Sequence, residues 1–252
     1  MKQMKFINPP KLPPAGVIHA TFYSKLFGQE VGYNIFLPPG YGKSGQTNPV
    51  VYHLHGWTDN ESSGLRPLRK VYKSRQAITV FPNNSPVIEG FEDLPVEAVL
   101  IDELIPHIDR EYRTDAARES RSISGFSMGG GMAFVFAVRH LDLFSAVTAY
   151  AGTYHHYYPR DYQTVGVERE KAAGIYEEMI RDGRHLEEDN VLCLIREHAA
   201  KIRENLNIGL HVGTNDILLC DNEILHLHLE SLHIPHEYKV IDGAAHRLKK
   251  IL

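Results

Sequence analysis

The sequence predicts a three-layer α/β domain around a mostly parallel sheet. Short runs rich in β-branched residues alternate with segments of helical periodicity. Several of these runs are almost continuously apolar, which is typical of strands buried on both faces. Such alternation favours parallel pairing with helices on both sides of the sheet. No repeat, low-complexity tract or Gly/Ser-rich linker divides the chain, so we expect residues 1–252 to form a single domain.

The expected strands begin with a pair at residues 17–23 and 31–37, joined by a turn around Gly28. Each later strand is a short run of the same character, bounded by turn residues. They cover residues 48–56, 77–83, 121–127, 144–152, 207–213 and 237–243.

Helices are expected at residues 95–112, 128–140 and 221–234; in the last of these, leucine and isoleucine recur at three- and four-residue steps. Residues 153–206 depart from the alternation, because an aromatic stretch is followed there by charged helical segments. About fifty residues are more than a crossover helix needs. We therefore predict a cap-like insertion after the strand that ends near residue 152.

Composition narrows the range of partners. A net charge of −4 provides no basic field for nucleic acid and no polybasic face for a membrane surface.

The chain has no signal-like apolar run and no stretch of about 18 apolar residues, so we expect a cytoplasmic protein, although a signal removed before this numbering would leave no trace. Cys193 and Cys220 lack metal-like spacing and are expected to be thiols in a reducing compartment. We expect no metal and no organic cofactor.

Ser127 is the candidate nucleophile. It lies between Gly125 and Gly129 in the pattern G-x-S-x-G, at the junction of an expected strand and an expected helix. A strand that turns directly into a helix holds the residue at the apex in a strained conformation and exposes its side chain. The helix N-terminus and the Met128 N–H would stabilise an oxyanion at the same place. The alternative is an ordinary serine N-cap, which this position makes less favoured.

A serine nucleophile requires a base and an orienting acid, in the chain order Ser, Asp or Glu, His. Asp216 and His246 each follow an expected strand, so both should lie at the sheet edge where Ser127 lies. Asp221 is a rival acid that can instead cap the next helix. His55, which precedes the nucleophile at the end of a strand, is interpreted as a structural hydrogen-bonding residue rather than the base.

Aromatic residues suggest how a substrate is bound. The backbone N–H of Trp57 is expected to be the second oxyanion donor, while its side chain either lines an acyl pocket or packs the loop. Tyr154, Tyr157 and Tyr158 at the start of the insertion suit stacking on an aromatic acyl group or a sugar ring. Packing of the insertion onto the domain explains these tyrosines equally well.

The motifs LPPGYG, NPVVYHLHG, ELIPHIDREYRTD, RSISGFSMGG, GTND and DGAAH resemble the putative-esterase family of α/β-hydrolases, over roughly residues 17–246. This family includes feruloyl and acetyl-xylan esterases, S-formylglutathione hydrolases, enterochelin-esterase-like enzymes and mycolyltransferases. The resemblance implies an α/β-hydrolase fold with Ser127, Asp216 and His246 as the triad. It also implies that the backbone groups of Trp57 and Met128 form the oxyanion hole.

The predicted function is that of a serine carboxylic-ester hydrolase that forms an acyl-enzyme. Its expected partner is a small ester, of an aromatic feruloyl- or cinnamoyl-type acid or of acetate, with a sugar or small alcohol. Two alternatives use the same triad: an S-formylglutathione-type thioester hydrolase and an acyltransferase. A non-catalytic binding module is less favoured, because such modules usually lose a member of the triad. The sequence does not predict the oligomeric state.

Overall fold

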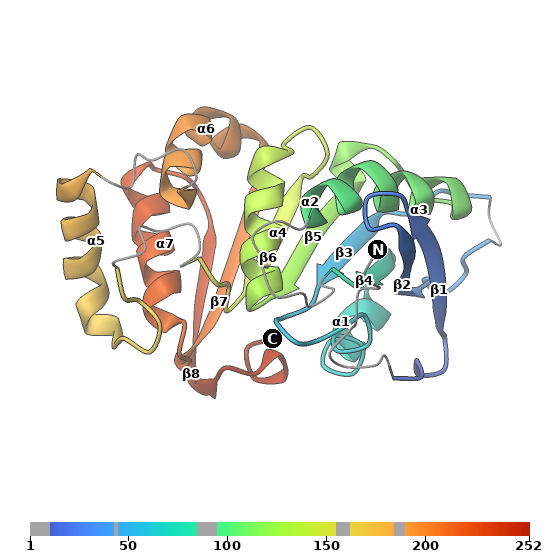
Figure 1. Cartoon of the computed structure of the whole chain (residues 1–252), viewed down its shortest axis with the longest axis horizontal. Coiled ribbons are helices and arrows are strands. Elements are labelled where there is room, and N and C mark those ends of the chain that lie inside the picture. Colours follow the sequence, from blue (N-terminus) through green and yellow to red (C-terminus); the bar gives the residue numbers. More distant parts are fainter. Residues whose placement is uncertain (1–10, 43–44, 85–94, 155–161, 184–189) are drawn as a thin grey trace. The chain divides into compact units, whose positions relative to one another are not determined.

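The computed structural model describes residues 11–42, 45–84, 95–154, 162–183 and 190–252. Within these ranges eight strands alternate with helices, so the predicted α/β class is confirmed (Figure 1). The residues group into two compact units, Met1–Ser122 and Ile123–Leu252. The prediction of one domain with a cap-like segment at 153–206 stays a prediction.

The first unit contains four strands, each within two residues of its expected bounds. They are β1 (Val17–Ser24), β2 (Gln29–Phe36), β3 (Val50–Leu54) and β4 (Ile78–Pro82). Their order is β1-β2-β4-β3, with antiparallel β1–β2 and β2–β4 pairs and a parallel β3–β4 pair. Every residue of β3 and β4 is buried, as their continuous apolar runs predict.

The helical region of the first unit is less regular than expected. The helix predicted at 95–112 consists of α2 (Val96–Ala98), a π-helical segment (Val99–Leu104) and α3 (Ile105–Glu111). Pro106 at the start of α3 has no N–H to donate to the preceding turn, and the widened segment lies directly before it. The short α1 (Arg69–Ser74) was not expected.

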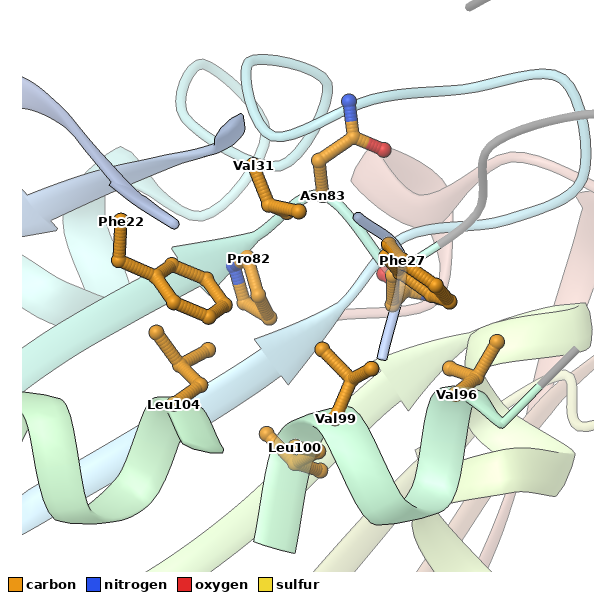
Figure 2. A pocket seen from close by; sticks show the side chains of 10 residues that line it. Phe22, Phe27, Val31, Pro82, Asn83, Val96, Val99, Leu100 and Leu104 are labelled. Carbon is orange, nitrogen blue, oxygen red and sulfur yellow. The ribbon is translucent and has the colours of Figure 1, made fainter. Parts of the chain in front are cut away.

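A small apolar cavity lies in the core of the first unit. Figure 2 shows Phe22 and Val31 from β1 and β2 on one side of it, and Val99, Leu100 and Leu104 from the π-helical segment on the other. Its volume of about 10 Å³ leaves room for one water molecule at most. It is therefore a gap in the core packing and is too small to hold an ester.

The second unit contains β5 (Arg121–Phe126), which begins at the last two residues of the first unit, and three further strands. These are β6 (Ala146–Tyr150), β7 (Asn207–Asn215) and β8 (Glu237–Ala245), in the order β5-β6-β7-β8. The β6–β7 and β7–β8 pairs are parallel, as predicted. The expected helices are α4 (Met128–Arg139), which packs on β6, and α7 (Leu219–Ser231), which packs on β7 (Figure 1).

The described parts of the predicted insertion form two helices, α5 (Ala172–Asp182) and α6 (Val191–Asn205). The Asn190 side chain caps α6 by accepting the Leu192 N–H at 2.8 Å, and α5 ends at Gly183 with a φ of +79°. α5 packs against α7, and α6 contacts α4 and α7. Short 3₁₀ turns occur at Arg118–Ser120, Arg169–Lys171 and Leu248–Lys250.

Cys193 and Cys220 are both buried and form no disulfide. None of the helices within the described ranges is long and apolar enough to cross a membrane.

Candidate active site

Ser127 lies at the apex of the turn between β5 and α4, with φ and ψ of 56° and −123°. A positive φ is uncommon for a residue other than glycine, so the surrounding backbone must hold it there. The Ser127 N–H donates to the Tyr150 carbonyl at 2.9 Å. The Ser127 carbonyl accepts the N–H groups of Gly130, Gly131 and Thr153, at 2.9 to 3.1 Å. The hydroxyl makes no capping hydrogen bond to α4, which removes the N-cap alternative.

The glycines around Ser127 are required by close approach of the backbone. A Cβ atom on Gly125 would lie 2.0 Å from the Gly129 carbonyl oxygen, and one on Gly131 would lie 2.0 Å from the Thr153 carbonyl oxygen. Both distances are far below van der Waals contact, so no larger residue fits without moving α4. The first turn of α4 can therefore follow β5 directly only because these positions lack side chains.

The pairing of β7 with β8 brings Asp216 and His246 together. Asn215, the last residue of β7, pairs with Ala245, the last residue of β8, and Asp216 and His246 follow them directly along the chain. The register shifts between Gly213 and Asn215, where a Cβ on Gly213 would lie 2.0 Å from the Ala244 carbonyl oxygen. β7 and β8 lie side by side in the second unit (Figure 1), and their parallel pairing places the residues that follow the two strands at the same edge of that unit.

A continuous chain of hydrogen bonds joins the three candidate residues. His246 Nδ1 lies 2.8 and 3.0 Å from the two Asp216 oxygens, and His246 Nε2 lies 2.9 Å from Ser127 Oγ. Because a carboxylate only accepts, Nδ1 carries the proton, and Nε2 of a neutral imidazole can accept the Ser127 hydroxyl proton. The Asp216 side chain is 0% exposed and also accepts the Leu218 N–H at 2.9 Å, whereas His246 is 24% exposed.

Asp221 has a different environment from Asp216. It is fully buried, and its carboxylate accepts the Tyr154 N–H and, at 3.0 Å, the Thr164 hydroxyl. It therefore ties two positions in the first part of the predicted insertion to α7. The structure brings Asp216 to His246, and Asp221 performs a separate structural role.

The aromatic candidates are placed as follows. Tyr154 is 0% exposed, and its ring packs edge-on against Phe134 with centroids 5.9 Å apart, which favours the packing interpretation over contact with substrate. Tyr157 and Tyr158 lie outside the described residues. Trp57, in the first unit, is 67% exposed.

The backbone N–H of Met128, a candidate oxyanion donor, belongs to the first turn of α4, where backbone N–H groups have no partner within the helix.

His55 has the structural role that its position in the sequence suggested. It is buried, and burial lowers the pKa of its imidazole, which keeps the ring neutral. Its Nδ1 donates to the Gly56 carbonyl at 2.8 Å, and its Nε2 accepts the Asn84 N–H at 3.2 Å. The imidazole thus holds the loop that begins directly before Trp57.

The sequence did not predict some of the contacts that hold the three candidate residues. These contacts are made by main-chain atoms and by one side chain at a variable position of the G-x-S-x-G pattern. Phe126, a variable residue of the G-x-S-x-G pattern, stacks on the His246 imidazole with ring centroids 4.8 Å apart. The Tyr150 carbonyl and the Leu218 N–H act through main-chain atoms, which carry no sequence signal. The described residues contain no group of three or more His, Cys, Asp and Glu that could hold a metal ion.

Solved structures of esterases share this fold. A ferulic acid esterase aligns with a TM-score of 0.71 and 24% identity, covering 93% of this chain and 92% of that one. An S-formylglutathione hydrolase from Staphylococcus aureus aligns with a TM-score of 0.71 and 15% identity, covering 92% of each chain. The α/β-hydrolase fold that the sequence predicts is thereby confirmed.

Curated relatives match about half of the chain. An esterase of Mycobacterium tuberculosis is 30% identical over an alignment of 141 residues, which covers 52% of this chain and 31% of that protein. An endo-1,4-beta-xylanase/feruloyl esterase of Xylanibacter ruminicola is 34% identical over an alignment of 145 residues, which covers 49% of this chain and 20% of that protein. The family described as "Putative esterase" matches residues 24–247, and the chain therefore belongs to this esterase family.

Proposed function

We propose that the protein is a serine carboxylic-ester hydrolase in which Ser127 is the nucleophile, His246 the general base and Asp216 the orienting acid. The observation that carries this proposal is the hydrogen-bonded chain from Asp216 through His246 to the hydroxyl of a serine held at positive φ. Membership of an esterase family supports the same reaction class.

The reaction proceeds in two halves. Ser127 Oγ attacks the ester carbonyl carbon as its proton passes to His246 Nε2, and the carbonyl π electrons move onto the oxygen. Collapse of the tetrahedral intermediate expels the alcohol, which takes the proton from His246, and leaves acyl-Ser127. Water then attacks the acyl carbon as one of its protons passes to His246 Nε2. The bond between the acyl carbon and Ser127 Oγ breaks, Oγ takes the proton back from His246, and the acid is released. Asp216 holds the imidazole in the required tautomer and stabilises its protonated form.

The oxyanion is stabilised by the N-terminal end of α4. The Met128 N–H follows the nucleophile directly, and the helix dipole places partial positive charge at that end. The prediction that the Trp57 N–H is the second donor is retained as part of this proposal. The reaction uses protein groups only and needs neither a metal nor an organic cofactor.

We propose esters of aromatic acids as the preferred substrates. The Xylanibacter relative is described as a feruloyl esterase, and so are solved structures of the same fold. Trp57 is exposed, and such a ring can stack on an aromatic acyl group. The likeness to S-formylglutathione hydrolase favours a thioester as the second candidate.

Specificity constants for a panel of esters test this choice. We expect kcat/KM for methyl ferulate to exceed that for an aliphatic methyl ester by about 10-fold or more, since burial of one aromatic ring contributes on the order of 1–3 kcal/mol. A higher kcat/KM for S-formylglutathione or for acetyl esters would contradict the aromatic assignment. An added sugar or alcohol that receives the acyl group at the expense of hydrolysis would identify an acyltransferase instead.

A further inference from the structure

Phe126 is the residue that covers the face of the catalytic base. It ends β5 directly before Ser127 and is half-buried. Its ring lies over the His246 imidazole with centroids 4.8 Å apart and planes inclined by 29°. This near-parallel arrangement is that of an offset stack.

The imidazole is held from two directions by groups of different chemistry. The Asp216 carboxylate binds its Nδ1 edge, and the Phe126 ring lies against its face. Asp216, from the loop after β7, is the charged side chain that contacts His246 among the described residues. Arg247 and Asp242, on the segment that carries His246, are exposed. Rotation about the His246 side-chain bonds would break both the hydrogen bonds and the stack.

Protonation of His246 makes the stack more favourable. The face of an aromatic ring carries partial negative charge and attracts a cation that lies above it. During the proposed attack, His246 receives the Ser127 proton and becomes a cation beneath the Phe126 ring. A neutral imidazole gains less from this contact, so the ring stabilises the transition state more than the resting enzyme.

From this geometry we propose that Phe126 is a positioning residue that orients His246 and stabilises its protonated form during catalysis. The proposal rests on the proposed function, because it requires His246 to be the general base. It assigns a role to a position that the G-x-S-x-G pattern leaves variable.

Substitution of Phe126 separates this role from simple packing. Phe126→Leu keeps an apolar side chain but removes the aromatic face, and Phe126→Tyr keeps the face. We expect Phe126→Leu to lower kcat about 10-fold with KM changed by less than about threefold, because the variant loses both the orientation of the imidazole and the contact with its protonated form in the transition state. The acid limb of its pH–rate profile should move to lower pH by about half a unit, because the cation loses a favourable contact. Phe126→Tyr should restore both values.

Phe134→Leu is the matched control. Phe134 lies in α4, and its buried ring packs on Tyr154. Loss of that ring should lower the unfolding midpoint but leave kcat and the pH–rate profile unchanged. If Phe126→Leu does not fold, Phe126→Met provides the same loss of an aromatic face with a more adaptable side chain.

Three results would overturn the role of Phe126 while leaving the proposed function intact, provided that turnover still depends on Ser127. The first is an unchanged kcat and pH–rate profile in folded Phe126→Leu or Phe126→Met. The second is a Phe126→Tyr variant that does not restore these values. The third is a raised KM as the only effect of Phe126→Leu. The last would make Phe126 a substrate contact. Absence of Ser127-dependent turnover in the wild type would overturn the proposed function, and this inference with it.

Discussion

Ser127→Ala is expected to abolish ester hydrolysis and to leave the fold intact. By analogy with loss of the nucleophile in other serine hydrolases, kcat should fall about 10⁶-fold. The variant loses the 2.9 Å hydrogen bond to His246 but keeps the backbone contacts that hold the turn, so stability should change by no more than about 1 kcal/mol. Hydrolysis of p-nitrophenyl acetate and thermal unfolding followed by circular dichroism measure the two effects.

Ser122→Ala provides the control for this substitution. Ser122 lies in β5, five residues before the nucleophile, and is half-buried. Its variant should hydrolyse the ester at the wild-type rate. Turnover by Ser127→Ala at or near the wild-type rate would rule out Ser127 as the nucleophile.

Asp216→Asn is expected to lower kcat about 10⁴-fold with little change in KM. The asparagine amide can donate to His246 Nδ1, which moves the imidazole proton to Nε2. Nε2 then cannot accept the proton of the Ser127 hydroxyl, although the hydrogen-bonded geometry is retained. Steady-state kinetics on the folded variant measure the loss.

Asp221→Asn is the matched control, because it makes the same change to a buried carboxylate five residues further along the chain. Asp221 holds the Tyr154 N–H and the Thr164 hydroxyl, so its variant should lose stability while its kcat remains close to that of the wild type. A large loss of kcat in Asp221→Asn, with near-normal turnover in Asp216→Asn, would reverse the assignment of the acid.

Much of the fold could be predicted because the chain alternates clear strand and helix patterns. The buried strands β3 and β4 consist of continuous apolar runs, and turn residues mark their ends. The candidate residues could be located because Ser127, Asp216 and His246 each come directly after the last residue of a strand. Parallel strands end at the same edge of a sheet, so three distant positions of the sequence converge.

Other features could not be read from the sequence because they depend on tertiary contacts. The π-helical segment Val99–Leu104 arises within a pattern that indicates an ordinary helix. Tyr154 is one of several tyrosines in its region, and only the fold shows that its ring is enclosed beside Phe134. Asp216 and Asp221 follow the same strand, and the register of β7 with β8 distinguishes them.

Covalent labelling with a fluorophosphonate tests directly whether Ser127 is the nucleophile, because the reagent reacts with activated serines. We expect one label per chain, located on Ser127 by mass spectrometry of peptides, with loss of ester hydrolysis in proportion to labelling. Ser127→Ala should remain unlabelled. A fully active chain that resists the reagent, or a label on another residue that accompanies the loss of activity, would contradict the assignment of Ser127 as the nucleophile.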